Sequence, residues 1–223
     1  MKEEIGGWSD RRIIYWFKQR SFAREIMRFL LKSVGLKNLR FNWRFPRPSI
    51  AFIRHRVNNK KLTGVEIGTN EGLNAESILK TLNIETLYLI DPFEEYVDIN
   101  TKQIKDRDLI KNLKYEEKDM NKIEIKCRKR LKNKQVIFIK KESNEAINDV
   151  PNNLDFVYID GNHTYEYVKD DLNNYWGKLR QGGFLCGHDC FFPNMGVQKA
   201  VFEFAIDKNF FHFGIDDWLI IKK

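Results

Sequence analysis

From Leu62 to the end of the chain, short runs of β-branched and apolar residues alternate with longer segments of helical periodicity. This alternation is typical of a parallel sheet whose two faces are covered by helices. The runs that read as strands are LTGVEIG, TLYLID, QVIFIK, LDFVYID, GGFLCGHD, FFHFG and DWLIIK. Only a short turn around Gly214 and Ile215 separates the last two runs, so we expect these to pair antiparallel. The sequence predicts an α/β fold with a seven-stranded, mainly parallel sheet that ends in an antiparallel C-terminal hairpin.

Two connections between these runs have the apolar spacing of an amphipathic helix. One carries Ala75, Ile78, Leu79 and Leu82, and the other carries Val168, Leu172, Trp176 and Leu179. We expect the glycine pair at 182–183 to end the second helix. The polar stretch 92–132 reads as an irregular insertion followed by a surface helix near 118–132.

The positive charge of the chain is concentrated at one end. Residues 1–61 contain sixteen Lys and Arg against four Asp and Glu, a balance of +12, whereas the net charge of the whole chain is +8. Residues 62–223 therefore carry 8 − 12 = −4. We divide the chain into a basic N-terminal helical extension, 1–61, in which Pro46 and Pro48 should break any helix, and a domain over 62–223.

Three interpretations of the basic extension stay open. Its apolar side can pack on its own domain or on a second subunit of a homodimer, which we favour. Its mixture of apolar and cationic residues is also compatible with peripheral contact to an anionic membrane, and its aromatic and arginine residues with binding of nucleic acid. The chain opens without a leader-like apolar stretch and has no apolar run of about 20 residues, so we expect a soluble protein. Three cysteines without a CxxC pair indicate a reducing, cytoplasmic location.

The first strand runs directly into a glycine-containing turn and a helix. In VEIGTNEGLNAESIL, Gly68 and Gly72 allow the backbone to approach a ligand closely, and the helix offers unpaired N–H groups. Asn70 stands where the dinucleotide motif GxGxxG has its second glycine, which disfavours a pyrophosphate and hence a nicotinamide-dependent oxidoreductase. The negative charge of Glu66 favours a cationic ligand instead.

Acidic and polar residues also follow the second and third strands. Asp91 ends the second strand, where an acid is suited to accept hydrogen bonds from both hydroxyls of a ribose. Glu142 and Ser143 follow the third strand, at a place suited to an adenine edge.

Together, the motifs VEIGTNEG, LYLIDPF, IKKESNEA, LDFVYIDGNHTYEYVKDDLNNYW and LRQGGFLCGHD make residues 62–223 resemble the class I S-adenosylmethionine-dependent methyltransferases. More narrowly, the chain resembles the branch of macrocin-type sugar O-methyltransferases and cephalosporin-hydroxylase-like proteins. The resemblance implies a Rossmann-like fold and S-adenosylmethionine as cofactor, with a hydroxylated small molecule or sugar as acceptor. It implies the following cofactor-binding residues: Glu66, Gly68, Thr69, Asn70, Gly72, Asp91, Glu142, Ser143 and Asp160.

Two further acids end strands at the edge of the sheet where ligands bind in such folds. Asp160 and Asp189 follow the fourth and fifth strands, each with a histidine close by at His163 and His188. In the sugar-methylating branch, acids at these positions hold Mg²⁺, and a histidine three residues after the first acid is the general base. We therefore predict Asp160 and His163 as catalytic residues and Asp160, Asp189 and His188 as ligands of Mg²⁺ or Mn²⁺. The branch often has two acids where this chain has His188-Asp189, so another metal, or none, stays open.

Structural roles are the alternatives for several of these residues. An alternative role for Asp160 is to cap the following helix, with His163 or Thr164 as its N-cap partner. An alternative for His188 is a position inside a strand, where the hydrogen bonds of its imidazole are satisfied. Cys186, His188 and Cys190 resemble a zinc pattern, but alternate positions lie on one face of a strand and no fourth ligand is near in sequence. For the whole chain, the alternatives are an RNA methyltransferase that uses the basic extension and a non-catalytic cofactor-binding protein.

Overall fold

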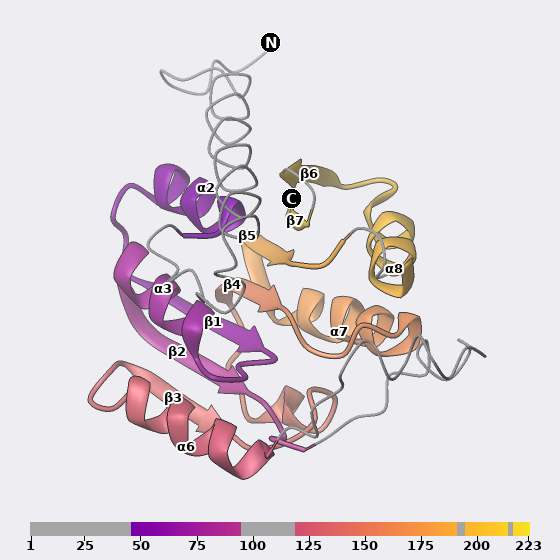
Figure 1. Cartoon of the computed structure of the whole chain (residues 1–223). Helices are drawn as coiled ribbons and strands as arrows, with labels where there is room; N and C mark the ends of the chain where they lie inside the picture. The colour runs from indigo at the N-terminus through magenta and orange to yellow at the C-terminus, as the bar shows by residue number, and fades with distance from the viewer. Residues whose placement is uncertain (1–45, 95–118, 191–194, 214–215) are drawn as a thin grey trace, which may run out of the picture.

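The computed structural model describes residues 46–94, 119–190, 195–213 and 216–223 of the 223-residue chain. Its strands form one sheet in the order β3-β2-β1-β4-β5-β7-β6 (Figure 1). The first five strands in this order are parallel, and β7 pairs antiparallel with both β5 and β6. The strands are β1 (Leu62–Ile67), β2 (Ile84–Ile90), β3 (Val136–Ile139), β4 (Leu154–Ile159), β5 (Leu179–Gly187), β6 (Asn209–Phe213) and β7 (Asp217–Ile221). The predicted α/β fold with an antiparallel C-terminal pair is confirmed.

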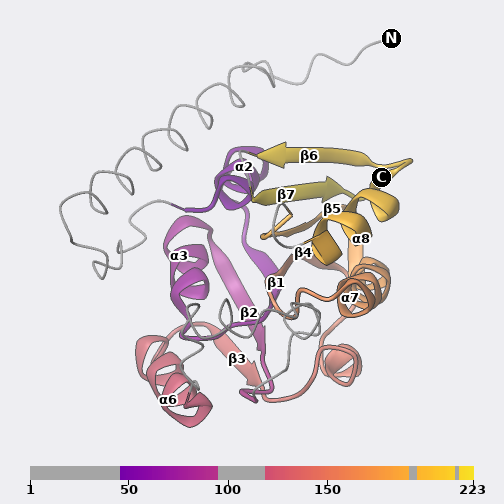
Figure 2. The same cartoon turned by 45° about the vertical axis from the view of Figure 1, so that its right-hand side comes forward.

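Helices cover both faces of the sheet (Figures 1 and 2). Helices α2 (Pro48–Val57), α3 (Leu73–Thr81) and α6 (Met120–Arg130) share one buried apolar cluster with the sheet. Helices α7 (Tyr165–Lys178) and α8 (Met195–Ala205) share a second cluster with the opposite face, together with the 3₁₀ turn η1 (Ala146–Asn148). Side chains alternate between the two clusters along β4, since Phe156 and Tyr158 belong to the first and Val157 and Ile159 to the second. Every residue of β4 is buried, as expected for the central strand of a covered sheet.

Helix α2 begins where the sequence predicts that a helix should break. Pro48 occupies the first turn, in which its fixed φ is helical and its missing N–H would have had no partner. Ile50, Phe52 and Ile53 of this helix are buried against the sheet. Residues 48–57 therefore pack into the same core as the domain, although the boundary at residue 61 stays a prediction. Most of the basic extension and of the predicted insertion lies outside the described residues, so their suggested partners stay predictions too.

The prediction that Gly182 and Gly183 end a helix is wrong. The sequence predicts that the helix before β5 continues to Gly182 and Gly183, but α7 ends at Lys178 and the strand begins at Leu179. Gly182 lies inside the strand with φ 71°, close to a register shift opposite β4. A left-handed residue in a strand is a bulge, for which glycine is suited.

No helix in the described ranges is both long and apolar enough to cross a membrane.

A buried carboxylate joins α2 to the sheet. Asp217, at the start of β7, is 2% exposed. It accepts a hydrogen bond from the backbone N–H of Ser49 at 2.6 Å and another from the hydroxyl of Tyr158 at 2.9 Å. Since Ser49 lies in the first turn of α2, Asp217 satisfies a helix N–H and also meets the positive end of the helix dipole.

We expect Asp217→Ala to lower the free energy of unfolding by about 3 kcal/mol, because it leaves two buried donors unsatisfied. Urea unfolding measures this change. The matched control is Asp207→Ala, an exposed acid between α8 and β6, which should cost less than about 0.5 kcal/mol. Equal stability of the two variants would contradict the anchoring role of Asp217.

Candidate active site at the carboxyl ends of the parallel strands

The predicted site residues gather at one edge of the sheet. The chain reverses its direction of strand addition between β1 and β4, which are neighbours in the sheet, and ligands of open α/β sheets bind at such a switch point. Gly68 has φ 82°, and a Cβ there would lie 2.2 Å from the carbonyl oxygen of Asp160. The turn after β1 therefore touches the turn after β4, and only glycine permits this contact.

Glu66 lies in β1 just before this turn and is fully buried. Its Oε1 accepts a hydrogen bond from the Asn74 side chain at 2.8 Å, whereas Oε2 has no hydrogen-bond partner in the described part of the chain. Burial raises the pKa of Glu66 to about 8, despite the bond from Asn74. The hydroxyl of buried Thr69 is likewise without a described partner. These orphaned atoms suit a polar ligand. A cationic group beside Glu66 would favour its ionised form and lower this raised pKa.

Asp91 connects the end of β2 to the glycine turn. Its carboxylate accepts hydrogen bonds from the backbone N–H of Asn70 at 2.8 Å and of Phe93 at 2.7 Å. Burial raises the pKa of Asp91, and these two backbone bonds oppose the rise. A carboxylate has about four acceptor positions, so Asp91 retains capacity for further donors such as ribose hydroxyls. Asn70 (φ 49°) and Gly72 (φ 75°) complete the left-handed turn before α3.

Ser143, beyond β3, is buried and held by α7. Its carbonyl oxygen accepts a hydrogen bond from the Tyr175 hydroxyl at 2.7 Å, and its side chain bonds to the Asp171 carboxylate. Burial raises the pKa of Asp171 to about 7, and the bond from Ser143 opposes this. Neither Asp171 nor the hydrogen bond of Tyr175 was predicted from the sequence. The spacing of these two residues indicates that they are buried, because both lie on the same helix face as Val168 and Leu172. Glu142, half-buried beside Ser143, has a raised pKa, mainly through burial.

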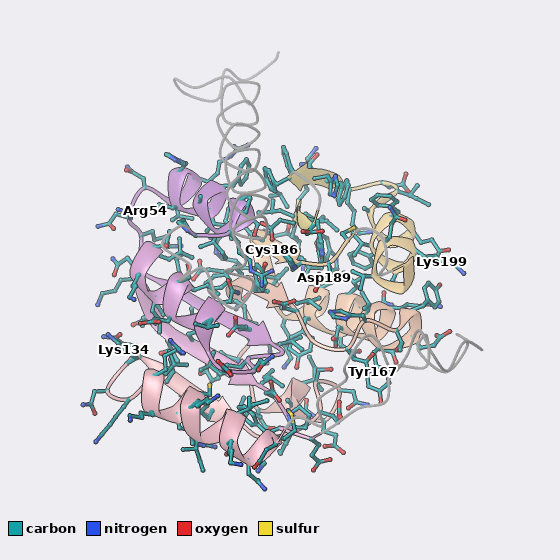
Figure 3. The ribbon with its side chains drawn as sticks, viewed as in Figure 1. Arg54, Lys134, Tyr167, Cys186, Asp189 and Lys199 are labelled. Carbon is teal, nitrogen blue, oxygen red and sulfur yellow. The ribbon has the colours of Figure 1, made fainter. Side chains whose placement is uncertain are left out.

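The acids after β4 and β5 lie together with a histidine. Asp160, His163 and Asp189 each offer one ligand atom, and these atoms all lie within 4.8 Å of one another. The Oδ2 of Asp189 is 3.0 Å from Nε2 of His163, and its Oδ1 is 3.1 Å from Nδ1 of His188. Burial would raise the pKa of Asp189, but the bonds from the two histidines lower it below its ordinary range. In Figure 3, Asp189 lies beyond the end of β5, between the sheet and α8.

Local backbone structure sets this arrangement. Asp189 itself has φ 57°, and the Asn162 side chain accepts a hydrogen bond from the backbone N–H of Thr164 at 2.9 Å. Thr164, not Asp160, occupies the N-cap position of α7. The alternative in which Asp160 caps this helix is therefore not supported. Gly196 of α8 packs so closely on this loop that a Cβ would lie 2.5 Å from the His163 carbonyl oxygen.

The cysteines near the site are structural in the described residues. Cys186 and Cys190 are buried, and the Cys186 thiol donates a hydrogen bond to the Val157 carbonyl at 3.3 Å. Burial raises the pKa of Cys190 to about 12, which disfavours the thiolate that zinc requires. Neither cysteine belongs to the described group of metal-ligating side chains, so the alternative of a zinc site gains no support.

Arg47 is a residue of the site that the sequence analysis missed. Its Nη2 lies 2.8 Å from Oδ2 of Asp160, and its guanidinium carbon lies 5.5 Å from the centre of the Tyr158 ring. Burial opposes the charge of Arg47, but Asp160 raises the pKa of the guanidinium above its ordinary value. Nothing in the sequence distinguished Arg47 from the other cations of residues 1–61, because its contact with Asp160 spans 113 residues.

The polar atoms at this edge of the sheet fit both the metal ion and the cofactor that the sequence predicts. Carboxylate oxygens and an imidazole within 4.8 Å are suitable ligands for Mg²⁺ or Mn²⁺. The orphaned Glu66 oxygen and the remaining acceptor capacity of Asp91 fit a cationic ligand that carries a ribose. We predicted His188 as the third metal ligand, but the group of three possible ligands contains His163 in its place. His188 contacts Asp189 through Nδ1.

Comparisons with known proteins identify the family and the fold of this chain. A family model described as a methyltransferase domain matches residues 65–190. An uncharacterized protein of Acanthamoeba polyphaga mimivirus is 30% identical over 133 residues, which are 57% of this chain and 51% of that protein, so the chain spans about half the length of this curated relative.

Two solved structures share the fold. The O-methyltransferase NovP has a TM-score of 0.57 and 21% identity over 78% of each chain. A putative caffeoyl-CoA O-methyltransferase from Staphylococcus aureus has a TM-score of 0.52 and 15% identity over 96% of this chain and all of the other. These likenesses establish the fold, and the family match covers more than half of the chain. The chain therefore belongs to the methyltransferase family, whose members are enzymes that use S-adenosylmethionine.

Proposed function

We propose that this methyltransferase methylates a hydroxyl group of a small molecule or sugar, with assistance from Mg²⁺ or Mn²⁺. The observation that carries the proposal is the meeting of Asp160, His163 and Asp189 directly beside the glycine turn. An imidazole and two carboxylates therefore lie next to the residues that we assign to the cofactor. O-methylation needs these groups, because a neutral hydroxyl is a poor nucleophile and must lose its proton.

Each end of the site has a separate task. When bound, S-adenosylmethionine supplies a methyl group on a cationic sulfur, and a divalent cation lowers the pKa of a hydroxyl that it contacts. Glu66, Asp91 and the backbone of residues 68–72 would hold the cofactor, and Asp160 and Asp189 would hold the cation. Their fixed positions on neighbouring strand ends contribute to the rate by aligning the reacting groups.

His163 receives the proton of the acceptor hydroxyl. Histidine is the side chain most often used as a general base, because its imidazole both accepts and donates protons readily. The resulting imidazolium is stabilised by Asp189, whose carboxylate already lies 3.0 Å from Nε2. His163 and Asp189 thus form a base and its orienting acid.

Asp91→Ala should weaken S-adenosylmethionine binding at least tenfold, about 1.4 kcal/mol, because the ribose hydroxyls lose a charged acceptor. Calorimetric titration measures the affinity, and thermal unfolding establishes that the variant is folded. Asp170→Ala, an exposed acid on α7, is the control and should bind like the parent protein. An Asp91 variant that is folded and binds equally well would remove Asp91 from the cofactor site.

Chelation should abolish turnover with an acceptor found by screening sugars and phenols, and added Mg²⁺ or Mn²⁺ should restore it. Formation of the demethylated cofactor measures turnover. In Asp189→Asn, the restoring concentration of metal should rise at least tenfold, because the amide lacks the negative charge. Turnover that is indifferent to chelator would falsify the metal-assisted form of the proposal while leaving the methyltransferase assignment intact.

His163→Ala should reduce turnover about 10²–10⁴-fold, the range for loss of a general base, with cofactor affinity unchanged. His212→Ala is the control, since His212 is exposed on β6. If the His163 variant turns over at the parental rate, then His163 has only a structural role in the loop before α7.

A further inference from the structure

Arg47 places a fixed positive charge on one of the carboxylates that we assign to the cation. Its Nη2 is 2.8 Å from Asp160 Oδ2, and the side chains of the two residues are only 13% and 17% exposed. A charge-assisted hydrogen bond at this length and burial is among the stronger side-chain contacts in proteins. The negative charge of Asp160 is therefore already paired with a positive charge of the same chain.

The position of Arg47 is determined by neighbouring buried groups. Ser49, two residues further on, is fixed by Asp217 through its backbone N–H, at 2.6 Å. The Asp217 carboxylate also accepts a hydrogen bond from the Tyr158 hydroxyl at 2.9 Å. The ring of Tyr158 lies beneath the guanidinium of Arg47. The arginine thus comes from a helix start that is tied to β4 and β7, and it is directed toward the end of β4.

A divalent cation and this guanidinium would compete for the same carboxylate. Both are positive, both use oxygen atoms of Asp160, and two cations on one carboxylate repel each other. The other acid of the group, Asp189, is paired with His163 and His188, which do not carry the permanent charge of an arginine. Asp160 is accordingly the ligand at which binding of a cation is opposed most strongly.

We propose that Arg47 is an internal counter-ion that must release Asp160 before a divalent cation binds, and that it thereby sets the affinity of the site for the metal. Arg47 acts through Asp160 and is a positioning residue. This inference rests on the metal-assisted function proposed above. It gives the segment before α2 a role in regulating the site, in addition to its packing on the sheet.

The test is a titration of the full chain with Mn²⁺ alone, followed by the electron paramagnetic resonance signal of the free ion. We expect Arg47→Met to bind Mn²⁺ about tenfold to hundredfold more tightly than the parent, because the competing charge is gone and the apolar stem remains. Arg47→Gln, a polar replacement, should show the same direction and serves if the Met variant does not fold. Arg47→Lys, which retains the charge, should stay within about threefold of the parent.

The matched control is Arg54→Met in α2, the helix that follows Arg47. Arg54 is exposed, bonds to the Asn59 side chain at 2.6 Å and lies at the periphery of the molecule in Figure 3. The Mn²⁺ affinity of the Arg54→Met variant should equal that of the parent protein. Unchanged or weaker binding in the folded Arg47 variants overturns the counter-ion role, even when the parent binds Mn²⁺.

Two outcomes separate this inference from the proposed function. If the parent binds Mn²⁺ and the Arg47 variants bind it no more tightly, then the metal site stands and only the role of Arg47 fails. If no protein in the series binds Mn²⁺, then the counter-ion role and the metal-assisted function both fail. Calorimetric titration with S-adenosylmethionine on the same samples then tests the methyltransferase site independently of the metal.

Discussion

The contact between the turns after β1 and β4 is the constraint on which the site depends. Parallel pairing of these two strands brings their carboxyl ends to one edge, and the missing side chain of Gly68 lets the backbone reach the Asp160 carbonyl. A larger residue at position 68 would separate the turns, since its Cβ would overlap that oxygen and φ 82° would strain the backbone. The proposed cofactor and acceptor regions are therefore adjacent because of backbone packing, before any side chain contributes.

The electrostatics of this edge are balanced locally. Asp160 pairs with Arg47, Asp189 pairs with two histidines, and Asp217 satisfies a helix N–H and a tyrosine hydroxyl. Glu66 is different, because it is fully buried and one of its oxygens has no described partner. Uncompensated burial of this kind is costly to folding and is typical of a position that a ligand completes.

The residues that sequence reasoning placed correctly are those fixed by local order. Strand runs and glycine turns locate Glu66, Asp91 and Asp160 at the edge of the sheet, because parallel strands end together. Arg47 and Asp217 escaped prediction, since their contacts span 113 and 168 residues. Pro48 was misjudged because proline both breaks a helix interior and begins a helix, and only the start of α2 distinguishes the two. Asp171 was not predicted as a buried residue, because a single acid on the apolar face of a helix does not change the helical pattern.

Helix α7 also acts as a spacer between the two ends of the crevice. It begins two residues after His163, and through Asp171 and Tyr175 it holds the Ser143 segment. The axial distance from Tyr165 to Asp171 is about 9 Å, set by the rise of an α-helix and not by loop conformation. The separation between the proposed base, His163, and the segment that we assign to adenine is consequently rigid. Changes of acceptor preference can then arise in the surrounding loops while the length of the ligand that spans the crevice stays constant.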